Sequence, residues 1–131
     1  MPKADLLLID APCSGVGTIR RNPWIKWSVT ESLIDHYAEI QSKLLEDHAG
    51  LVKPGGRLVY STCSLLRKEN EEVVEGFLSR HSEFRSMLPT AMLSQLGIES
   101  TKESRHVQLL PHKHGTDGFF VAVLVKKEYI Q

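Results

Sequence analysis

The apolar residues of the chain form short continuous runs that alternate with longer helical repeats. Residues 5–10 (DLLLID) hold an apolar run without polar alternation. Such a run is typical of a strand that is buried on both faces of a parallel sheet. Over residues 30–51, apolar side chains instead recur every three or four positions, with charged side chains between them. This period predicts an amphipathic helix, which Ser28 or Thr30 caps.

The same alternation continues through the rest of the chain. The segment KPGG at residues 53–56 predicts the end of the first helix, because proline and glycine are typical of helix C-termini. Residues 57–61 (RLVYS) predict the next strand, and residues 69–78 predict a second helix with its apolar residues on one side. Residues 107–110 predict a short strand, and residues 118–126 predict a final strand that runs antiparallel at this end of the sheet.

The order strand, helix, strand, helix predicts an open α/β sheet in which the first two strands are parallel and joined by a right-handed crossover. Parallel neighbours end at the same edge of a sheet, about 4.8 Å apart. Cys13 and Cys63 each follow one of these two strands. We therefore expect both thiols to line one crevice at the carboxyl edge of the sheet.

Composition narrows the classes of function. The chain has 131 residues, the size of one domain, with 16 basic and 16 acidic residues. This balance argues against a protein that binds nucleic acid or membranes over its whole surface, so any such binding needs a local patch. No apolar run approaches the roughly 18 residues of a spanning helix, and no basic region followed by an apolar stretch stands at the start. We therefore expect a cytoplasmic protein with no membrane partner.

The cysteines and histidines argue against structural disulfides and metal sites. Two cysteines fifty residues apart, without a C-x-x-C motif, fit neither a disulfide-rich scaffold nor a structural zinc site. His112 and His114 form a His-x-His pair that lacks a third ligand at a suitable spacing, so no metal site is predicted. We expect two free thiols in a reducing compartment.

Three residues near the predicted crevice are candidates for chemistry. Cys13 and Cys63 are candidate nucleophiles, since a cysteine reacts well even when little of it is ionised; the alternative is that both are small buried apolar residues. Asp10 could orient or protonate a substrate, or it could cap the turn by accepting backbone N–H bonds. Glu69 and the acidic residues after it are expected in the first turns of a helix, and we assign them no chemistry.

A compact basic and aromatic group follows the first cysteine and consists of Arg20, Arg21, Trp24, Lys26 and Trp27. Such a group can bind the phosphates of RNA and stack on its bases. The alternative is a solvated surface loop with one tryptophan packed in the core. Arg20 also stands where the glycine-rich nucleotide fingerprint needs its last glycine, so this segment is not such a fingerprint.

Two cysteine motifs carry a family resemblance: DAPCSG at residues 10–15 and STCSL at residues 61–65. Together they resemble the Nop2/Sun family of RNA cytosine-C5 methyltransferases, and among these the bacterial Sun-type (Fmu) ribosomal RNA enzymes. The similarity extends through RRNPWIKW, LVKPGGRLVYSTCSL, ENEEVVEGFL and HGTDGFFVAVLVK, so it covers nearly the whole chain. One departure is Trp24, where the family pattern usually has an acidic residue.

The resemblance implies the Rossmann-like fold of S-adenosylmethionine-dependent methyltransferases. This chain would be the C-terminal half of the mostly parallel sheet, with its antiparallel final strand. S-adenosylmethionine would be the methyl donor, and the substrate would be RNA, in particular 16S ribosomal RNA. Family members carry their main cofactor loop ahead of the position of Met1, so we expect residues 1–131 to be a partial catalytic domain that is inactive alone.

The resemblance also implies roles for single residues. Cys63 would attack C6 of cytosine, Cys13 would assist release, and Asp10 would hold N3 and the exocyclic amine of the base. Asp10 would also border the cofactor, together with Pro12. The RNA would be bound by Arg20, Arg21 and Lys26.

Two other functions are compatible with the same residues. One is a non-catalytic RNA-binding or assembly module that has kept the methyltransferase fold. The other is a thiol redox protein, which would use an oxidised state of its cysteines. In addition, the apolar strand at residues 6–9 is expected to be an exposed edge that pairs with another copy of the chain.

Overall fold

The computed structural model describes residues 2–87, 106–110 and 116–128, and the structural statements below concern these residues. Helices, short 3-10 helices (η) and strands follow one another along the chain. In order they are β1 (Ala4–Asp10), η1 (Val16–Thr18), α1 (Ile25–Ser28), α2 (Glu31–His48), η2 (Ala49–Leu51), β2 (Val52–Thr62), α3 (Glu71–Arg80), β3 (Phe84–Met87), β4 (Val107–Leu109) and β5 (Phe119–Lys126).

The strands form one mixed sheet in the order β1, β2, β5, β3, with β4 also paired to β5. β1 and β2 are parallel, and Asp10 lies opposite Ser61 at their carboxyl ends. β5 is antiparallel to β2, β3 and β4. The predicted α/β class, the parallel first pair and the antiparallel final strand are confirmed. β3 has no counterpart among the predicted elements, because four residues are too short for a clear period.

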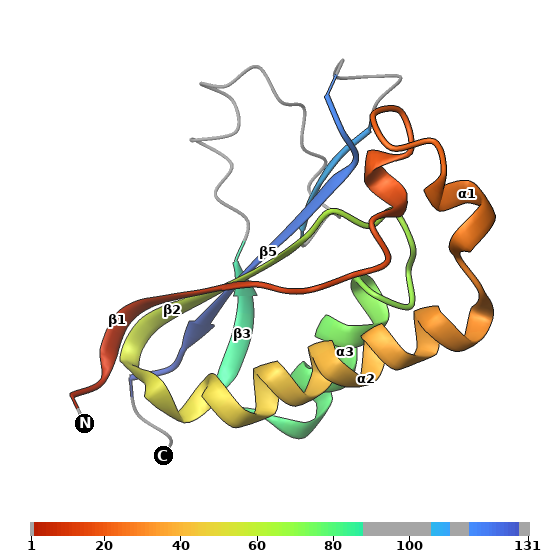
Figure 1. Ribbon diagram of the computed structural model, residues 1–131. Coiled ribbons are helices and arrows are strands. Elements are labelled where there is room, and N and C mark those ends of the chain that lie inside the picture. Colours follow the sequence, from red (N-terminus) through yellow and green to blue (C-terminus); the bar gives the residue numbers. More distant parts are fainter. Residues whose placement is uncertain (1, 88–105, 111–115, 129–131) are drawn as a thin grey trace.

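α2 and α3 lie side by side on one face of the sheet (Figure 1). Leu45 of α2 and Phe77 of α3 are fully buried in one cluster with Leu58 and Tyr60 of β2 and Phe120 of β5. Burying apolar surface contributes about 25 cal/mol per Å², so these large side chains stabilise the fold most. This cluster packs both helices against the sheet whose strands β1 and β2 end at the two cysteines.

The helix boundaries depart slightly from those expected. Thr30 caps α2 as predicted, because its side chain accepts a hydrogen bond of 3.2 Å from the backbone nitrogen of Leu33. α2 ends at His48 and not at residue 51, and the intervening residues Ala49–Leu51 form a 3-10 turn. α3 begins at Glu71, later than the predicted residue 69.

Strand β2 is longer than predicted. It begins at Val52 and so includes the KPGG segment that was expected to end the preceding helix. The register of its pairing with β1 shifts between Ala4 and Leu6, so this segment bulges out of the ladder. Gly55 takes a left-handed φ of 83° in the bulge, which other residues rarely adopt. The glycines therefore serve an irregular strand and not a helix terminus.

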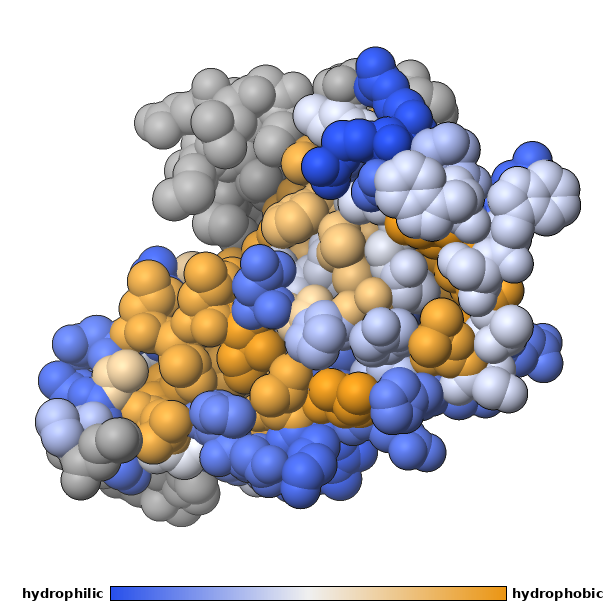
Figure 2. Space-filling model, in the orientation of Figure 1, coloured by the Kyte–Doolittle hydropathy of each residue, from blue (hydrophilic) through white to orange (hydrophobic). Residues whose placement is uncertain are grey.

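The face of β1 that points away from the helices is open. Leu7 and Ile9 pack toward the core, whereas Leu6 and Leu8 are 61% and 63% exposed. Figure 2 shows apolar surface gathered over β1. The prediction that this strand is buried on both faces is therefore wrong, because α2 and α3 cover one face only. β1 is the edge strand of the described sheet, as expected.

Candidate active site

The two thiols meet at the carboxyl edge of the sheet. Cys13 follows β1 by three residues, and Cys63 comes directly after β2. Their Sγ atoms are 3.1 Å apart, within hydrogen-bonding distance for sulfur, and both side chains are half-buried free thiols. The prediction that both cysteines meet at the carboxyl edge of the sheet is confirmed. It follows from the parallel pairing of β1 and β2, which brings together turns fifty residues apart in the sequence.

The pKa values of the two thiols are shifted in opposite directions. The hydrogen bond from Cys13 lowers the pKa of Cys63 to about 7, although burial and the charges of Asp10 and Glu69 oppose this change. The same hydrogen bond, together with burial, raises the pKa of Cys13 well above its ordinary value. Cys63 is therefore the more acidic thiol of the pair and is partly ionised near neutral pH, whereas Cys13 stays protonated.

Close backbone packing holds the loop of the first cysteine against the second. The amide of Gly17 donates to the carbonyl of Cys63 at 2.8 Å, and the amide of Gly118 donates to the carbonyl of Gly17 at 2.6 Å. A Cβ on Gly17 would lie 2.5 Å from the carbonyl oxygen of Cys63, so no larger residue fits without movement. The glycine in this segment therefore serves a backbone contact between the two cysteine loops.

Asp10 and Pro12 lie at the same edge. The hydroxyl of Ser61 donates to Oδ1 of Asp10 at 3.1 Å, and the amide of Ala11 donates to the carbonyl of Ser61 at 2.9 Å. The side chains of Asp10 and Pro12 are exposed. They are therefore accessible to a base or a cofactor that enters the edge beside the thiols, and this exposure fits the roles predicted for them.

The three predicted RNA-binding residues lie on the surface after the first cysteine. Arg20, Arg21 and Lys26 are all exposed. Nε of Arg21 pairs with Asp117 at 3.1 Å, and Nζ of Lys26 lies 5.1 Å from the centroid of the Trp27 ring. Trp27 is 82% exposed.

Trp24, at the start of α1, is also 63% exposed. The surface-loop alternative expected one of the two tryptophans in the core, and this expectation is wrong. Two exposed indoles beside basic side chains form a surface on which bases can stack.

Glu69 is the main residue of this site that the sequence analysis missed. It was expected in the first turn of a helix, but it precedes α3 and its side chain is fully buried. Its carboxyl group accepts hydrogen bonds from the amide and hydroxyl of Ser14, both at 2.7 Å, from the hydroxyl of Ser64, and from Nε2 of Gln41 at 3.3 Å. The sequence carries no local signal for this role, because an acidic residue next to a helix start is ordinarily a partner of the helix dipole.

Asn70 completes the network under the second cysteine. The hydroxyl of Thr62 donates to Oδ1 of Asn70 at 2.6 Å, and Nδ2 of Asn70 donates to the carbonyl of Ser64 at 2.8 Å. Both groups are buried, so these bonds satisfy polar atoms that would otherwise be costly. The residues on either side of Cys63 are therefore anchored to the start of α3.

The part of the chain that the structure describes offers neither a metal site nor a membrane-spanning helix. No group of three His, Cys, Asp or Glu side chains there could hold a metal ion. None of the described helices has the length and apolar character needed to span a bilayer. His112 and His114 lie outside the described residues.

Sequence comparison relates the chain to ribosomal RNA methyltransferases. A sequence model for "16S rRNA methyltransferase RsmB/F" matches residues 2–125. The "Probable ribosomal RNA small subunit methyltransferase B" of Bacillus subtilis is 42% identical over 123 residues, which cover 94% of this chain and 28% of that protein. Its namesake from Synechocystis is 45% identical over 122 residues, covering 93% of this chain and 27% of that protein. The chain thus spans little more than a quarter of these relatives.

Solved structures share the fold. "Crystal Structure of PH0851" has a TM-score of 0.83 and 41% identity, covering 94% of this chain and 27% of that chain. "NSun6 from Pyrococcus horikoshii with SFG" has a TM-score of 0.78 and 30% identity, covering 98% of this chain and 31% of that chain. These similarities agree with the predicted methyltransferase fold.

Proposed function

The chain belongs to the RsmB/F family of 16S rRNA methyltransferases, and we propose that the whole protein methylates C5 of a cytosine in 16S ribosomal RNA, with S-adenosylmethionine as donor. The observation that carries this proposal is the thiol pair, in which Cys63 is acidified by a donor 3.1 Å away. Methylation at C5 needs a nucleophile for C6, because C5 of cytosine alone is a poor nucleophile. The relative solved with SFG, an analogue of S-adenosylmethionine, supports the choice of donor.

Cys63 is the proposed nucleophile. Its thiolate adds to C6, a sulfur–carbon bond forms, and the electron pair of the C5=C6 bond moves to C5. S-adenosylmethionine supplies the methyl group that the activated C5 accepts. Asp10 holds the base: its carboxyl group accepts from the exocyclic amine and shares a proton with N3, since both N3 and a carboxylate oxygen are acceptors. With Pro12 it borders the cofactor. The base has to be unpaired or flipped out of its helix to reach this edge.

Cys13 is the residue proposed to release the methylated base from Cys63. Once the sulfur of Cys63 is bonded to C6, Cys13 loses two of the effects that raise its pKa, the hydrogen bond with Cys63 and then the charge of that sulfur. Cys13 can then lose its proton to solvent and take the proton from C5. The electron pair of the C5–H bond re-forms the C5=C6 bond, and the pair of the S–C6 bond returns to Cys63 as a thiolate.

The basic loop is the proposed contact with RNA. Arg20, Arg21 and Lys26 would bind phosphates, and the exposed indoles of Trp24 and Trp27 would stack on bases. Because RNA of the small ribosomal subunit is the proposed substrate and two free thiols need a reducing compartment, we also propose a cytoplasmic location.

Separate substitution of the two cysteines in the whole protein tests the mechanism. Cys63→Ala should abolish methylation and any covalent RNA adduct, because no activated C5 can form. Cys13→Ala should allow attack and methyl transfer but stall elimination, so a protein–RNA adduct should accumulate. Each variant is incubated with substrate RNA and S-adenosylmethionine and then run on a denaturing gel.

The outcomes separate the candidate functions. An adduct from Cys63→Ala but not from Cys13→Ala would reverse the two assignments. No adduct from either variant, combined with normal RNA binding and no methyl transfer by the unsubstituted protein, would favour the non-catalytic RNA-binding module. Loss of stability in both variants without an adduct would indicate that the thiols only fill space.

A further inference from the structure

Each of the two cysteines is followed by a serine, and the hydroxyls of both serines donate hydrogen bonds to the same carboxylate oxygen. The hydroxyls of Ser14 and Ser64 both donate to Oε2 of Glu69, and for Ser14 the distance is 2.7 Å. Ser14 and Ser64 are adjacent in sequence to the two thiols but lie fifty residues from one another. One buried carboxyl group therefore joins the backbone positions that carry both sulfur atoms.

Two more donors complete the environment of this carboxyl group. Oε1 of Glu69 accepts from the amide of Ser14 at 2.7 Å and from Nε2 of Gln41 at 3.3 Å. The same nitrogen of Gln41 donates to the carbonyl of Pro12 at 2.9 Å. A carboxylate only accepts hydrogen bonds, from about four donors. The amide and hydroxyl of Ser14, the hydroxyl of Ser64 and the amide of Gln41 supply that number. A neutral amide in its place could not accept all of these bonds.

Glu69 is itself fixed to the sheet. The hydroxyl of Tyr60, a fully buried residue of β2, donates to the backbone carbonyl of Glu69 at 2.6 Å. Asn70 is bonded to Thr62 and Ser64, so the backbone on both sides of the carboxyl group is held. The carboxyl group of Glu69 therefore fixes the loop that follows β1 relative to β2.

We propose that Glu69 is a positioning residue that holds the two Cys-Ser loops together, so that the sulfur atoms of Cys13 and Cys63 stay within hydrogen-bonding distance. This role in the reaction rests on the proposed function, whereas the role in thiol geometry does not. Glu69 touches neither sulfur in a hydrogen bond, so it acts through Ser14 and Ser64. It is not itself a catalytic residue.

A competing explanation is that Glu69 acts only through its charge. The two explanations give opposite signs for Glu69→Gln. The charge of Glu69 raises the pKa of Cys63, so removing the charge alone should lower that pKa below about 7. The hydrogen bond from Cys13 lowers the pKa of Cys63, so loss of this contact should raise the pKa toward the ordinary cysteine value.

The experiment compares the 131-residue chain with its Glu69→Gln variant. The chain contains only two cysteines, so every thiol readout refers to Cys13 or Cys63. The first readout is the rate at which diamide, a thiol oxidant, converts the pair to a disulfide, measured by thiol titration. The second is the pH midpoint of iodoacetamide alkylation of Cys63, followed by peptide mass spectrometry. Circular dichroism confirms that each variant is folded under the conditions used.

Glu71→Gln is the matched control. Glu71 is also buried, stands two residues further on in the first turn of α3 and pairs with Arg67 at 3.3 Å. The control removes the same charge and costs helix stability, but no cysteine loop bonds to this side chain in the described contacts. A merely structural effect would therefore appear equally in both variants.

We expect Glu69→Gln to slow disulfide closure about tenfold or more, the factor that corresponds to losing one hydrogen bond to a charged group, and to raise the alkylation midpoint of Cys63. Glu71→Gln should change neither. An unchanged closure rate in folded Glu69→Gln, or a midpoint that falls, would overturn the proposal. These readouts need neither RNA nor a methyl donor, so they stand or fall independently of the cysteine substitutions that test the proposed function.

Smaller substitutions keep the proposal testable if Glu69→Gln does not fold. Ser14→Ala and Ser64→Ala each remove one hydroxyl donor and leave the carboxyl group with its other partners. Each should slow closure, and the double variant should slow it by less than the product of the two single effects if both act through the same group. Closure at the unsubstituted rate in both single variants would contradict the proposal.

Discussion

The sulfur atoms of Cys13 and Cys63 differ in acidity although they lie 3.1 Å apart. One proton between two sulfurs favours a single thiolate, and the neighbouring groups decide which sulfur carries it. The pKa of Cys63 is lowered by its hydrogen bond with Cys13, whereas the same hydrogen bond and deeper burial raise the pKa of Cys13, so Cys63 is the more acidic of the two. The proposed division of roles between attack and release thus agrees with the difference in burial and hydrogen bonding between two residues of the same type.

The basic loop yields a prediction at the scale of single side chains. Replacing Arg20, Arg21 and Lys26 with glutamine in the whole protein should weaken RNA binding and flatten its salt dependence. Each phosphate contact to single-stranded RNA contributes about 0.7 to the slope of log K against log salt, so three contacts correspond to about 2. Arg21 contributes least if its pairing with Asp117 persists in the complex. Binding isotherms at several salt concentrations measure the slope.

A control with the same change in net charge separates local contact from overall electrostatics. Lys43, Lys53 and Arg57 are exposed on α2 and at the beginning of β2, away from the cysteine loops. Their replacement with glutamine should leave the salt slope nearly unchanged. Equal slopes in the two triple variants would indicate that the loop after Cys13 is an ordinary solvated surface and does not bind RNA.

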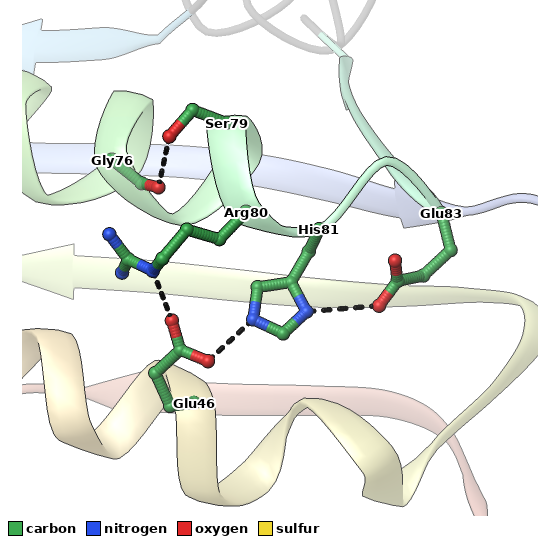
Figure 3. Close-up of polar contacts among 6 residues, drawn as sticks. All are labelled: Glu46, Gly76, Ser79, Arg80, His81 and Glu83. Carbon is green, nitrogen blue, oxygen red and sulfur yellow. Dashed lines mark hydrogen bonds and ion pairs between the residues drawn. The ribbon is translucent and has the colours of Figure 1, made fainter.

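At the scale of elements, one histidine joins the C-terminal ends of both helices to β3. Nε2 of His81 lies 2.5 Å from Glu46 on α2, and Nδ1 lies 3.0 Å from Glu83 just before β3 (Figure 3). Arg80 pairs with the other oxygen of Glu46 at 2.6 Å, and Phe77 stacks on the imidazole with centroids 4.3 Å apart. Burial opposes the charged ring, but the hydrogen bonds to the two carboxylates outweigh it and raise the pKa of His81.

This cluster predicts a pH-dependent contribution to stability. The pKa of His81 is raised in the folded state, so its stabilisation is fully present below the unfolded pKa of about 6.5 and is lost as the pH rises through the folded pKa. His81→Gln should therefore lower Tm most at about pH 6 and least at about pH 9. Thermal unfolding followed by circular dichroism at both pH values measures the two differences.

His36→Gln is the comparison for that measurement, since His36 lies in the first half of α2 and is exposed. Its effect on Tm should be small and similar at both pH values. If the loss caused by His81→Gln instead grew with rising pH, the charged form of the imidazole would not be the stabilising one.

At the scale of the whole molecule, the open face and free edge of β1 predict self-association. Leu6 and Leu8 are more than half exposed on a strand whose outer edge is unpaired in the described sheet. Such an edge can pair with a second copy of the same chain, and lysine on the strand opposes this pairing. The 131-residue chain should therefore form dimers or larger species at high concentration, and Leu6→Lys with Leu8→Lys should shift it to monomer. Sedimentation velocity measures the distribution.

The exposed indoles provide the control for self-association. Trp24→Lys with Trp27→Lys removes apolar surface of similar exposure from α1 and leaves β1 unchanged. This variant should associate as the unsubstituted chain does. A strict monomer at high concentration for the unsubstituted chain would contradict association through β1.

Much of the fold could be predicted from the sequence because its determinants are local. The three-and-four spacing over residues 30–51 specifies a helix, and Thr30 begins it because its hydroxyl bonds to the amide of Leu33. Apolar runs of strand length before each cysteine specify two strands, and the intervening helix makes them parallel. That order places Cys13 and Cys63 at the same edge of the sheet, and the direct pairing of β1 with β2 brings their sulfur atoms to 3.1 Å.

Contacts between distant segments were decided only in the tertiary structure. Glu69 has the sequence context of an exposed residue at a helix start, yet it is fully buried, and hydroxyls of Ser14, 55 positions earlier, and of Ser64 replace its hydration. Leu6 and Leu8 look like core residues by hydropathy, yet they are exposed because both helices cover the opposite face. The local pattern along the chain determines which element forms, but the burial and hydrogen bonds of a side chain depend on the elements that pack around it.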